Sequence, residues 1–274
     1  MKLLTPKIIR SIIKPREAAS HKGNYGHALL IAGNKGKMGS AVIAAKACLR
    51  TGNGLLTVNV PQHERMILQT AIPEAMLQMR ETNDNNLEKY SAIGIGPGIG
   101  TTPYSVKILS GVIKTYPKPI VLDADALTII SNHKTLFKTI TEGTIITPHP
   151  KEFDRLFGMH KDDNARRETA IKKAKEYAIV IVLKGHHTCI SFNGETFMNT
   201  TGNAGLAKGG SGDALTGIIT SFLAQGYNSF NAAKLGVYMH GLATDITLKK
   251  QSMESMLITD VIENLGKAFK FVLK

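Results

Sequence analysis

The chain has 274 residues, 43% of them hydrophobic, which is long enough for one large α/β domain and too apolar for a disordered polypeptide. The formal net charge of +13 favours anionic partners, but the lysines are scattered and only 6% of residues are aromatic, so we favour a multiply phosphorylated small molecule and expect no nucleic-acid partner. Cys48 and Cys189 lack a paired motif, and no apolar run could form a signal peptide or span a membrane, so we expect a cytoplasmic protein with free thiols.

Strand and helix patterns alternate along most of the chain after a basic segment that ends near residue 26, which we expect to lie on the body as an arm or helix. Strands are predicted at 27–32, 55–60, 75–79, 91–95, 119–122, 144–146 and 178–183. Helices are predicted at 40–50, 64–70 and 103–115, and from 212 to the end. Asn193-Gly194 indicates a hairpin between strands at 188–192 and 195–198.

This order predicts an α/β fold with a mainly parallel central sheet and helices on both faces. Because no linker or internal repeat divides the sequence, we expect a single domain over residues 1–274. Ligands of such folds bind at the carboxyl ends of the strands. The segments expected there converge on one shared site and are 33–39, 96–100, 123–125, His149 and 184–188. The loop at 33–39 matches neither a dinucleotide fingerprint nor a P-loop.

A glycine-rich stretch, 201–212, runs directly into an apolar helical pattern in which Leu215, Ile218 and Phe222 recur at spacings of three and four. The start of such a helix presents unpaired N–H groups and positive dipole potential, so the stretch predicts a phosphate site. Asp213 lies at that start. It could cap the helix, or it could act as a general base beside a transferring phosphoryl group.

The string GNAGLAKGGSGD at 202–213, followed by LTGII at 215–219, resembles the anion-hole signature of the ribokinase-like superfamily. It is more similar still to the ADP-dependent (S)-NAD(P)H-hydrate dehydratases, and the resemblance extends over nearly the whole chain from about Tyr25. It implies a ribokinase-like fold and the ADP-dependent dehydration of the S form of hydrated NADH or NADPH to NAD(P)H, AMP and phosphate. The ring hydroxyl is expected to be phosphorylated first, after which phosphate is eliminated.

The resemblance also implies the cofactors and partners. It implies Mg²⁺, ADP as co-substrate, hydrated NADH or NADPH as substrate, and a homo-oligomer. The epimerase domain that is fused at the N-terminus of some relatives cannot fit here, so we expect a separate NAD(P)H-hydrate epimerase to interconvert the R and S hydrates. Lys208 stands where we expect Thr, which could alter the nucleotide preference.

Individual residues take their expected roles from the same resemblance. Asp213 is implied as the catalytic base. Contacts with the hydrated dinucleotide are implied for Ala41, Gly98, His149 and Asp213. Contacts with the adenine nucleotide are implied for Lys184, Gly185, His186, His187, Thr188, Asn203, Gly209, Gly210, Ser211 and Gly212. Glu152 is expected to help organise Mg²⁺ indirectly, through water or phosphate.

The motif TPHPKEF at 147–153 separates two kinds of enzyme. Many small-molecule kinases of the superfamily carry Asn at the position of His149, whereas the hydrate dehydratases are expected to carry His. A lone His is more often structural, but this context favours a hydrogen bond from His149 to the substrate. The sequence leaves the roles of other polar residues undecided. Asp123 and Asp125 could hold Mg²⁺ through water, although we favour a helix cap for Asp125. For His240, which precedes a glycine on a late helix, we favour helix packing.

Two alternatives to the dehydratase remain. A kinase of the hydroxyethylthiazole kinase type would use ATP to make a stable phosphoester, and His149 in place of Asn argues against it. A nucleotide- or RNA-binding module without turnover is compatible with the net charge of +13. The sequence leaves open the preference for ADP or ATP, the preference for either hydrate, and the oligomeric state.

Overall fold

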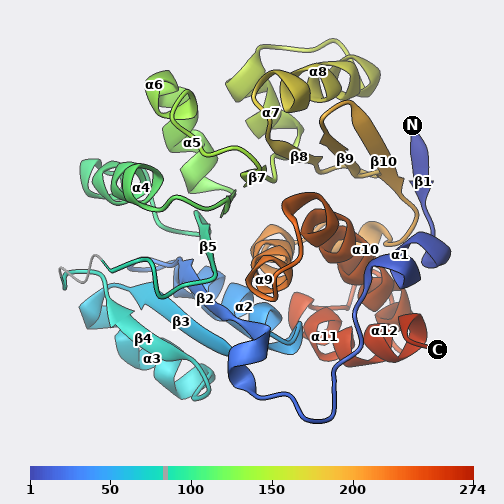
Figure 1. Ribbon diagram of the computed structural model, residues 1–274, viewed down its shortest axis with the longest axis horizontal. Helices are drawn as coiled ribbons and strands as arrows, with labels where there is room; N and C mark the ends of the chain where they lie inside the picture. The colour runs from blue at the N-terminus through green and yellow to red at the C-terminus, as the bar shows by residue number, and fades with distance from the viewer. Residues whose placement is uncertain (83–85) are drawn as a thin grey trace.

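A computed structural model describes residues 1–82 and 86–274, and its centre is one ten-stranded sheet (Figure 1). The strands are β1 (Lys2–Leu4), β2 (His27–Ile31), β3 (Leu55–Val60), β4 (Met76–Met79), β5 (Ala92–Ile95), β6 (Ile120–Leu122), β7 (Ile145–Ile146), β8 (Val180–Leu183), β9 (Cys189–Phe192) and β10 (Glu195–Asn199). Their order is β1-β10-β9-β8-β7-β6-β5-β2-β3-β4. All neighbours are parallel except the two pairs that β9 forms.

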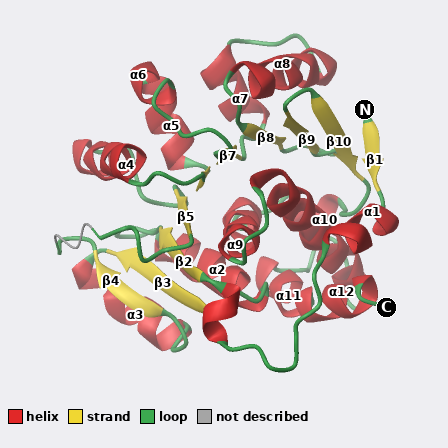
Figure 2. Ribbon diagram, in the orientation of Figure 1, coloured by secondary structure: helices red, strands yellow, loops and turns green. Residues whose placement is uncertain are grey.

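Helices cover both faces of the sheet, as Figure 2 shows in red. One face carries α1 (Pro6–Ile12), α2 (Met38–Arg50), α3 (Arg65–Ala71), α9 (Ser211–Ala224), α10 (Ser229–Leu248), α11 (Ile258–Glu263) and α12 (Leu265–Val272). The other carries α4 (Pro103–Thr115), α5 (Asp125–Asn132), α6 (Lys134–Phe137), α7 (Pro150–Phe157) and α8 (Asp163–Glu176).

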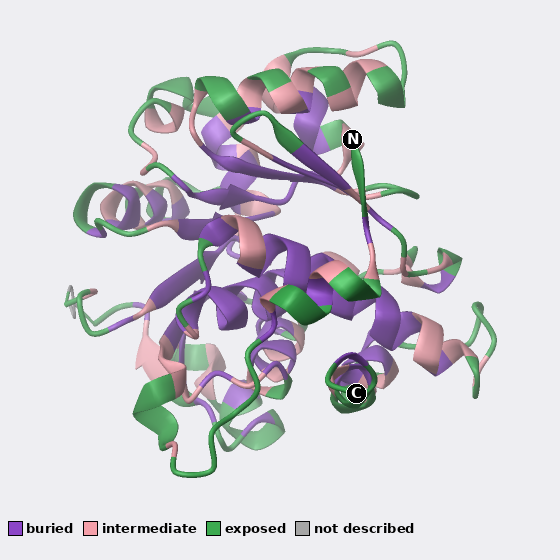
Figure 3. Cartoon of the chain, turned by 45° about the vertical axis from the view of Figure 1, so that its right-hand side comes forward, coloured by how far each residue is buried: buried purple, intermediate pink, exposed green. Residues whose placement is uncertain are grey.

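Each face has its own apolar core, because successive strand residues point to opposite sides of a sheet. In β2, Ala28 and Leu30 join the core under α2, α9 and α10, while Leu29 and Ile31 join the core under α4, α5 and α7. Figure 3 shows the strands and central helices as mostly buried. Strands buried on both faces read as continuous apolar runs, which is why the sequence indicated them so clearly.

The topology places a switch point at the pair β2 and β5. From β2 the chain proceeds outward through β3 to β4, and from β5 it proceeds the other way through β6 and β7 to β8. Loops that follow β2 and β5 therefore diverge at the carboxyl edge of the sheet, where ligands of open α/β folds bind. The hairpin β9–β10 extends the same sheet beyond β8, with its turn at Asn193-Gly194.

The predicted fold is confirmed, and the predicted elements have boundaries shifted by at most two residues, whereas α6, α7 and α8 were not predicted. The helix predicted at 103–115 and the strand predicted at 55–60 agree with α4 and β3 at both ends. The first strand was missed: β1 pairs parallel with β10 at one edge of the sheet, and its three residues are too few to form a pattern. No helix in the described part of the chain is long and apolar enough to cross a membrane.

Candidate active site

The start of α9 is held in a conformation that suits glycine. Gly210 is the N-cap of α9 with φ +92°, and a Cβ there would lie 2.6 Å from Ile43 Cδ1 of α2. Beyond it, all residues from Ala214 to Ala224 are buried. The apolar helix therefore fixes its own first turn, at residues 211–213, at the carboxyl edge of the sheet. N–H groups of a first turn lack a partner within the helix, although the Ser211 amide donates to the Lys208 carbonyl at 3.4 Å.

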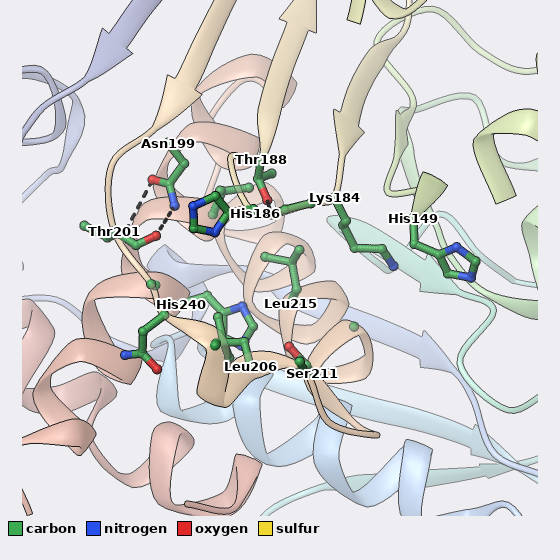
Figure 4. A pocket seen from close by; sticks show the side chains of 18 of the residues that line it. His149, Lys184, His186, Thr188, Asn199, Thr201, Leu206, Ser211, Leu215 and His240 are labelled. Carbon is green, nitrogen blue, oxygen red and sulfur yellow. Dashed lines mark hydrogen bonds between the residues drawn. The ribbon is translucent and has the colours of Figure 1, made fainter. Parts of the chain in front are cut away.

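A pocket of about 590 Å³ opens beside this turn (Figure 4). The expected nucleotide residues that line it are Lys184, Gly185, His186, Thr188, Asn203, Ser211 and Gly212, and His149 lines it as well. Its volume lies in the usual range for small-molecule sites. The pocket thus joins the loop after β8 to the start of α9, two segments far apart in the sequence.

Three of the expected nucleotide residues lie outside the pocket lining. His187 is exposed, and its ring lies tilted against the His186 ring at a centroid distance of 4.2 Å. Gly209 is exposed with open space around its Cα, while Gly210 faces Ile43. Their contacts with a nucleotide stay predictions.

The expected substrate residues gather at the switch point, beside the pocket. Gly98 lies against Ser40 and the carbonyl of Lys37, where an added Cβ would be 3.0 Å from Ser40 Cβ. Ala41 is fully buried, with its Cβ facing Gly33, so its side chain is inaccessible to a ligand. Asp213 also reaches this side, where the Ser40 side chain hydrogen-bonds it.

Two hydrogen bonds join the loops after β2 and β5. The Gly33 amide donates to the Pro97 carbonyl at 2.8 Å, and Asn34 Nδ2 donates to the Ile99 carbonyl at 3.0 Å. The buried Arg80 guanidinium holds the first of these loops by donating to the Gly33 carbonyl at 2.8 Å. The two glycine-containing loops therefore form one braced unit.

Lys184 lies between the pocket and this unit. Its Nζ donates to Asp123 Oδ1 at 2.8 Å and lies 3.9 Å from Glu152 Oε2. Asp123 is 1% exposed and also accepts from Thr216 Oγ1 at 2.8 Å. Gly212 covers the pair, since an added Cβ would be 3.2 Å from Lys184 Nζ. The lysine charge is thus positioned by a buried carboxylate directly under the first turn of α9.

Asp213 has a perturbed protonation equilibrium. Burial raises the pKa of its carboxyl above the ordinary value. The hydrogen bond from Ser40 and the positive charge of Lys184 oppose this rise, while the negative charges of Asp123 and Asp125 add to it. A carboxylate with a raised pKa is a stronger base than an exposed one, and such perturbed groups concentrate at functional sites.

His149 is the N-cap of α7 in a complete capping box. Its Nδ1 accepts from the amides of Lys151 and Glu152, and Glu152 Oε2 accepts from the His149 amide at 2.9 Å. Because Nδ1 accepts, Nε2 carries the proton, and this nitrogen lies 3.4 Å from Glu152 Oε1. Burial lowers the pKa of the His149 imidazole. His149 thus has a structural role, and it also lines the pocket.

The structure overturns one expectation about neighbouring residues and adds contacts for two others. Asp125 does not cap α5, because Ala124 is the N-cap; Asp125 instead accepts from the Gly100 amide at 2.8 Å. Lys208 does not approach the phosphate region, because its Nζ donates to the carbonyls of Glu254 and Met256. His240 is buried on α10, which agrees with the packing role that we favoured, and it also lines the pocket.

The far wall of the pocket was missed in the sequence. It consists of Asn199 at the end of β10, Thr201 and Leu206 between β10 and α9, Leu215 of α9, and Val237, His240 and Gly241 of α10. Asp245 holds this wall by accepting from the Gly202 amide at 2.8 Å and from Asn203 Nδ2 at 2.9 Å. The spacing of 237, 240 and 241 on one helical face was the available signal.

Comparison with known proteins decides the family. The family model for NAD(P)H-hydrate dehydratase matches residues 28–267. The chain belongs to the NAD(P)H-hydrate dehydratase family. It is 34% identical to an ADP-dependent (S)-NAD(P)H-hydrate dehydratase from Bacillus subtilis, with 97% of this chain and 98% of that protein covered. The bifunctional NAD(P)H-hydrate repair enzyme Nnr of Moorella thermoacetica is 35% identical over 96% of this chain, which spans only 53% of that protein.

Solved structures agree with this membership. A Bacillus subtilis ADP/ATP-dependent NAD(P)H-hydrate dehydratase co-crystallised with ATP and Mg²⁺ has a TM-score of 0.86 at 33% identity and covers 99% of this chain and 98% of its own. A ribokinase-like superfamily protein from Enterococcus faecalis has a TM-score of 0.88 at 30% identity, covering 100% and 97%. The ribokinase-like fold expected for this dehydratase family member is confirmed.

The residues around the pocket can bind Mg²⁺ only indirectly, through phosphate oxygens and water molecules that coordinate the ion. Within residues 1–82 and 86–274, no group of three or more His, Cys, Asp or Glu side chains could hold a metal ion. Asp123 already accepts from Lys184 and Thr216, and Glu152 is engaged in its capping box. Both carboxylates nevertheless lie within 3.9 Å of Lys184 Nζ, where phosphate is predicted to bind, and this suits a hydrated divalent cation.

Proposed function

We propose that this chain catalyses the ADP-dependent dehydration of the S form of hydrated NADH or NADPH, giving NAD(P)H, AMP and phosphate. The observation that carries the proposal is the position of Asp213. It follows Gly212, which lines the nucleotide pocket, and its carboxylate reaches Ser40 beside the Gly98 loop. A base at that boundary can serve a hydroxyl on one side and a phosphoryl group on the other.

In this mechanism the nucleotide occupies the pocket with its phosphates at Ser211, Gly212 and Lys184. The first-turn amides of α9 and the Lys184 ammonium stabilise negative charge on the transferring phosphoryl group. Asp213 accepts the proton of the ring hydroxyl while the hydroxyl oxygen bonds to the β-phosphorus of ADP. At the same time the bond between that phosphorus and the oxygen bridging to the α-phosphate breaks, so that AMP leaves.

The second step is elimination. The ring nitrogen next to the phosphorylated carbon donates its electron pair as the C–O bond breaks, and phosphate departs with that bond's electrons. Loss of a proton from the adjacent ring carbon restores the dihydronicotinamide. The Nε2–H of His149 hydrogen-bonds the substrate in this arrangement, and the joined loops after β2 and β5 hold the ring.

Mg²⁺, when bound with the nucleotide, neutralises phosphate charge and polarises the phosphoryl oxygens. Glu152 and Asp123 would face it through water. Their role is electrostatic, because their direct oxygen contacts are already taken within the protein.

The remaining features of the proposal concern organisation. The two ends of the chain contribute to one fold, since β1 pairs with β10 and α12 packs against α10, which supports a single domain over residues 1–274. We further propose a cytoplasmic homo-oligomer that works with a separate NAD(P)H-hydrate epimerase.

Product analysis tests the proposed function. The protein is incubated with the S hydrate, ADP and Mg²⁺ while the absorbance of reduced nicotinamide is followed. We expect NAD(P)H, AMP and free phosphate in equal amounts, and no NAD(P)H without the nucleotide. A stable phosphorylated alcohol with no phosphate release would instead identify a small-molecule kinase, and no turnover combined with steeply salt-dependent RNA binding would identify a binding module.

A further inference from the structure

His240 of α10 carries a polar atom that the protein leaves without a partner. The side chain is 5% exposed and lines the pocket, where Figure 4 shows its ring among the lining side chains. Its Nε2 is completely buried, and in the part of the chain that the structure describes it is the only buried side-chain nitrogen or oxygen without a hydrogen bond. Such a group costs folding free energy, and because the ring lines the pocket, a turn of the ring would bring the nitrogen to a ligand that could pair it.

The imidazole is uncharged near neutral pH. Burial lowers the pKa of His240 to about 4, and the positive charge of Lys184 contributes to that lowering. A neutral imidazole offers one N–H donor and one nitrogen acceptor. It is therefore matched to an uncharged hydrogen-bonding ligand group, whereas phosphate charge is met by Lys184 and the first turn of α9.

The wall around His240 is largely apolar, and its polar side chains Asn199 and Thr201 hydrogen-bond each other. Leu206, Leu215 and Val237 line the same pocket, and Gly241 lets the chain at Thr201 pass directly over α10. Apolar surfaces with one fixed polar group suit a flat ring whose faces are apolar and whose edge carries donors and acceptors. A purine base has that character, and a sugar or phosphate group does not.

We propose that His240 hydrogen-bonds the edge of the purine base of the nucleotide co-substrate and so contributes to base recognition. This inference rests on one part of the proposed function, namely that the pocket binds the nucleotide. The two ends of the nucleotide are then bound by different interactions. The charge of Lys184 binds the phosphates, and a neutral hydrogen bond from His240 binds the base.

Two substitutions separate this role from packing. His240→Leu keeps approximately the volume and removes both ring nitrogens, whereas His240→Gln places an amide near the position of Nε2. Tyr238→Phe is the matched control, because Tyr238 is a buried ring on the same helix that does not line the pocket. Dissociation constants are measured by calorimetry for AMP, and by competition for ribose 5-phosphate, which keeps the sugar and phosphate but lacks the base.

We expect His240→Leu to weaken AMP binding by about 3- to 10-fold, the usual value of one hydrogen bond. His240→Gln and Tyr238→Phe should stay within about twofold, and ribose 5-phosphate binding should not change. The ligand-free His240→Leu protein should melt no lower than wild type, because it no longer buries an unpaired nitrogen.

Unchanged AMP affinity in His240→Leu would overturn the proposal, and so would an equal loss of AMP and ribose 5-phosphate binding. A lowered melting temperature with unchanged affinity would show a purely structural histidine. These binding measurements do not use the hydrate. A wild-type protein that binds AMP in the predicted pattern but never dehydrates the S hydrate would therefore refute the proposed function and leave the His240 contact standing.

Discussion

Two regions of the molecule treat the same residue types in opposite ways. At the corner between α7 and α8, His160 uses both ring nitrogens, with Nδ1 2.8 Å from Asp154 Oδ1 and Nε2 2.9 Å from Thr169 Oγ1. Arg166 donates to both oxygens of Asp154, at 3.0 and 2.7 Å. At the start of α9 and along α10, Asp213 is desolvated and only partly compensated by the charge of Lys184, and His240 Nε2 has no hydrogen-bond partner among the described residues.

The protonation equilibria follow this difference. Hydrogen bonding from Arg166 lowers the pKa of Asp154, whereas burial raises the pKa of Asp213. In the region between α7 and α8, the polar groups pair with one another and so connect the two helices. The second region leaves its polar groups available, which costs stability and is expected where a ligand completes the site.

The largest effect should come from Asp213→Asn. Loss of a positioned general base commonly reduces the rate by about 10²- to 10⁴-fold, so we expect kcat to fall by that factor while the Kd for ADP changes little. The variant should be at least as stable as wild type at pH 7, because it removes a carboxylate whose ionisation is opposed by burial. Steady-state kinetics and calorimetry measure both; an unchanged kcat would remove Asp213 from the chemistry.

Asp154→Asn should show the opposite pattern. It leaves Arg166 and His160 without their carboxylate, so we expect a loss of about 1–3 kcal/mol in unfolding free energy with kcat unchanged. Since the pKa of Asp154 is lowered in the folded state, its contribution is present above the ordinary Asp pKa and is lost as pH falls through the folded value. Denaturant titrations of variant and wild type should therefore converge on acidification. The control is Asp163→Asn, whose ion pair with Arg166 is exposed and should contribute little.

Gly241→Ala tests the close approach that forms the pocket wall. The new Cβ would lie 2.4 Å from Thr201 Oγ1 and 2.6 Å from the Thr201 carbonyl, so Thr201 and its loop must shift. We expect a cost of about 1–3 kcal/mol and weaker nucleotide binding. Gly111→Ala, in open space on α4, should instead stabilise the protein by about 0.5–1 kcal/mol. Equal effects of the two substitutions on nucleotide affinity would contradict the account of this wall.

The smallest effect should come from Lys208→Thr. Because the Lys208 ammonium donates to the carbonyls of Glu254 and Met256, its replacement should leave the ratio of kcat/KM for ADP and ATP within about twofold. A larger change in that ratio would mean that Lys208 reaches the phosphates during turnover.

The fold was predictable from the sequence because its strands and helices have strong local patterns. Parallel strands such as β5 and β8 are continuous apolar runs, and α9 follows its glycine loop directly. The three-residue β1 carried no such pattern, because its pairing with β10 depends on contacts 195 residues away, as between Lys2 and Phe197.

The site was predictable where residues lie within a motif and not where distant segments meet. Lys184 and Gly212 could be placed at the pocket from their motifs, and both line it. The partner of Asp125 is the Gly100 amide and those of Lys208 are carbonyls 46 and 48 residues away, so neither could be read locally. The unpaired nitrogen of His240 is a property of packing around α10 and has no sequence signature.

The central claim is that the Asp213 carboxylate accepts a proton during turnover, and the pH dependence of kcat/KM tests it most directly. Because only the ionised form is a base and burial raises its pKa, the wild-type rate should fall on acidification at a pH above the ordinary Asp value. In Asp213→Asn, the pH profile of the residual kcat/KM should lack the protonation step of Asp213 and keep the protonation steps of the substrates. An acid limb that is identical in the two proteins would contradict the account.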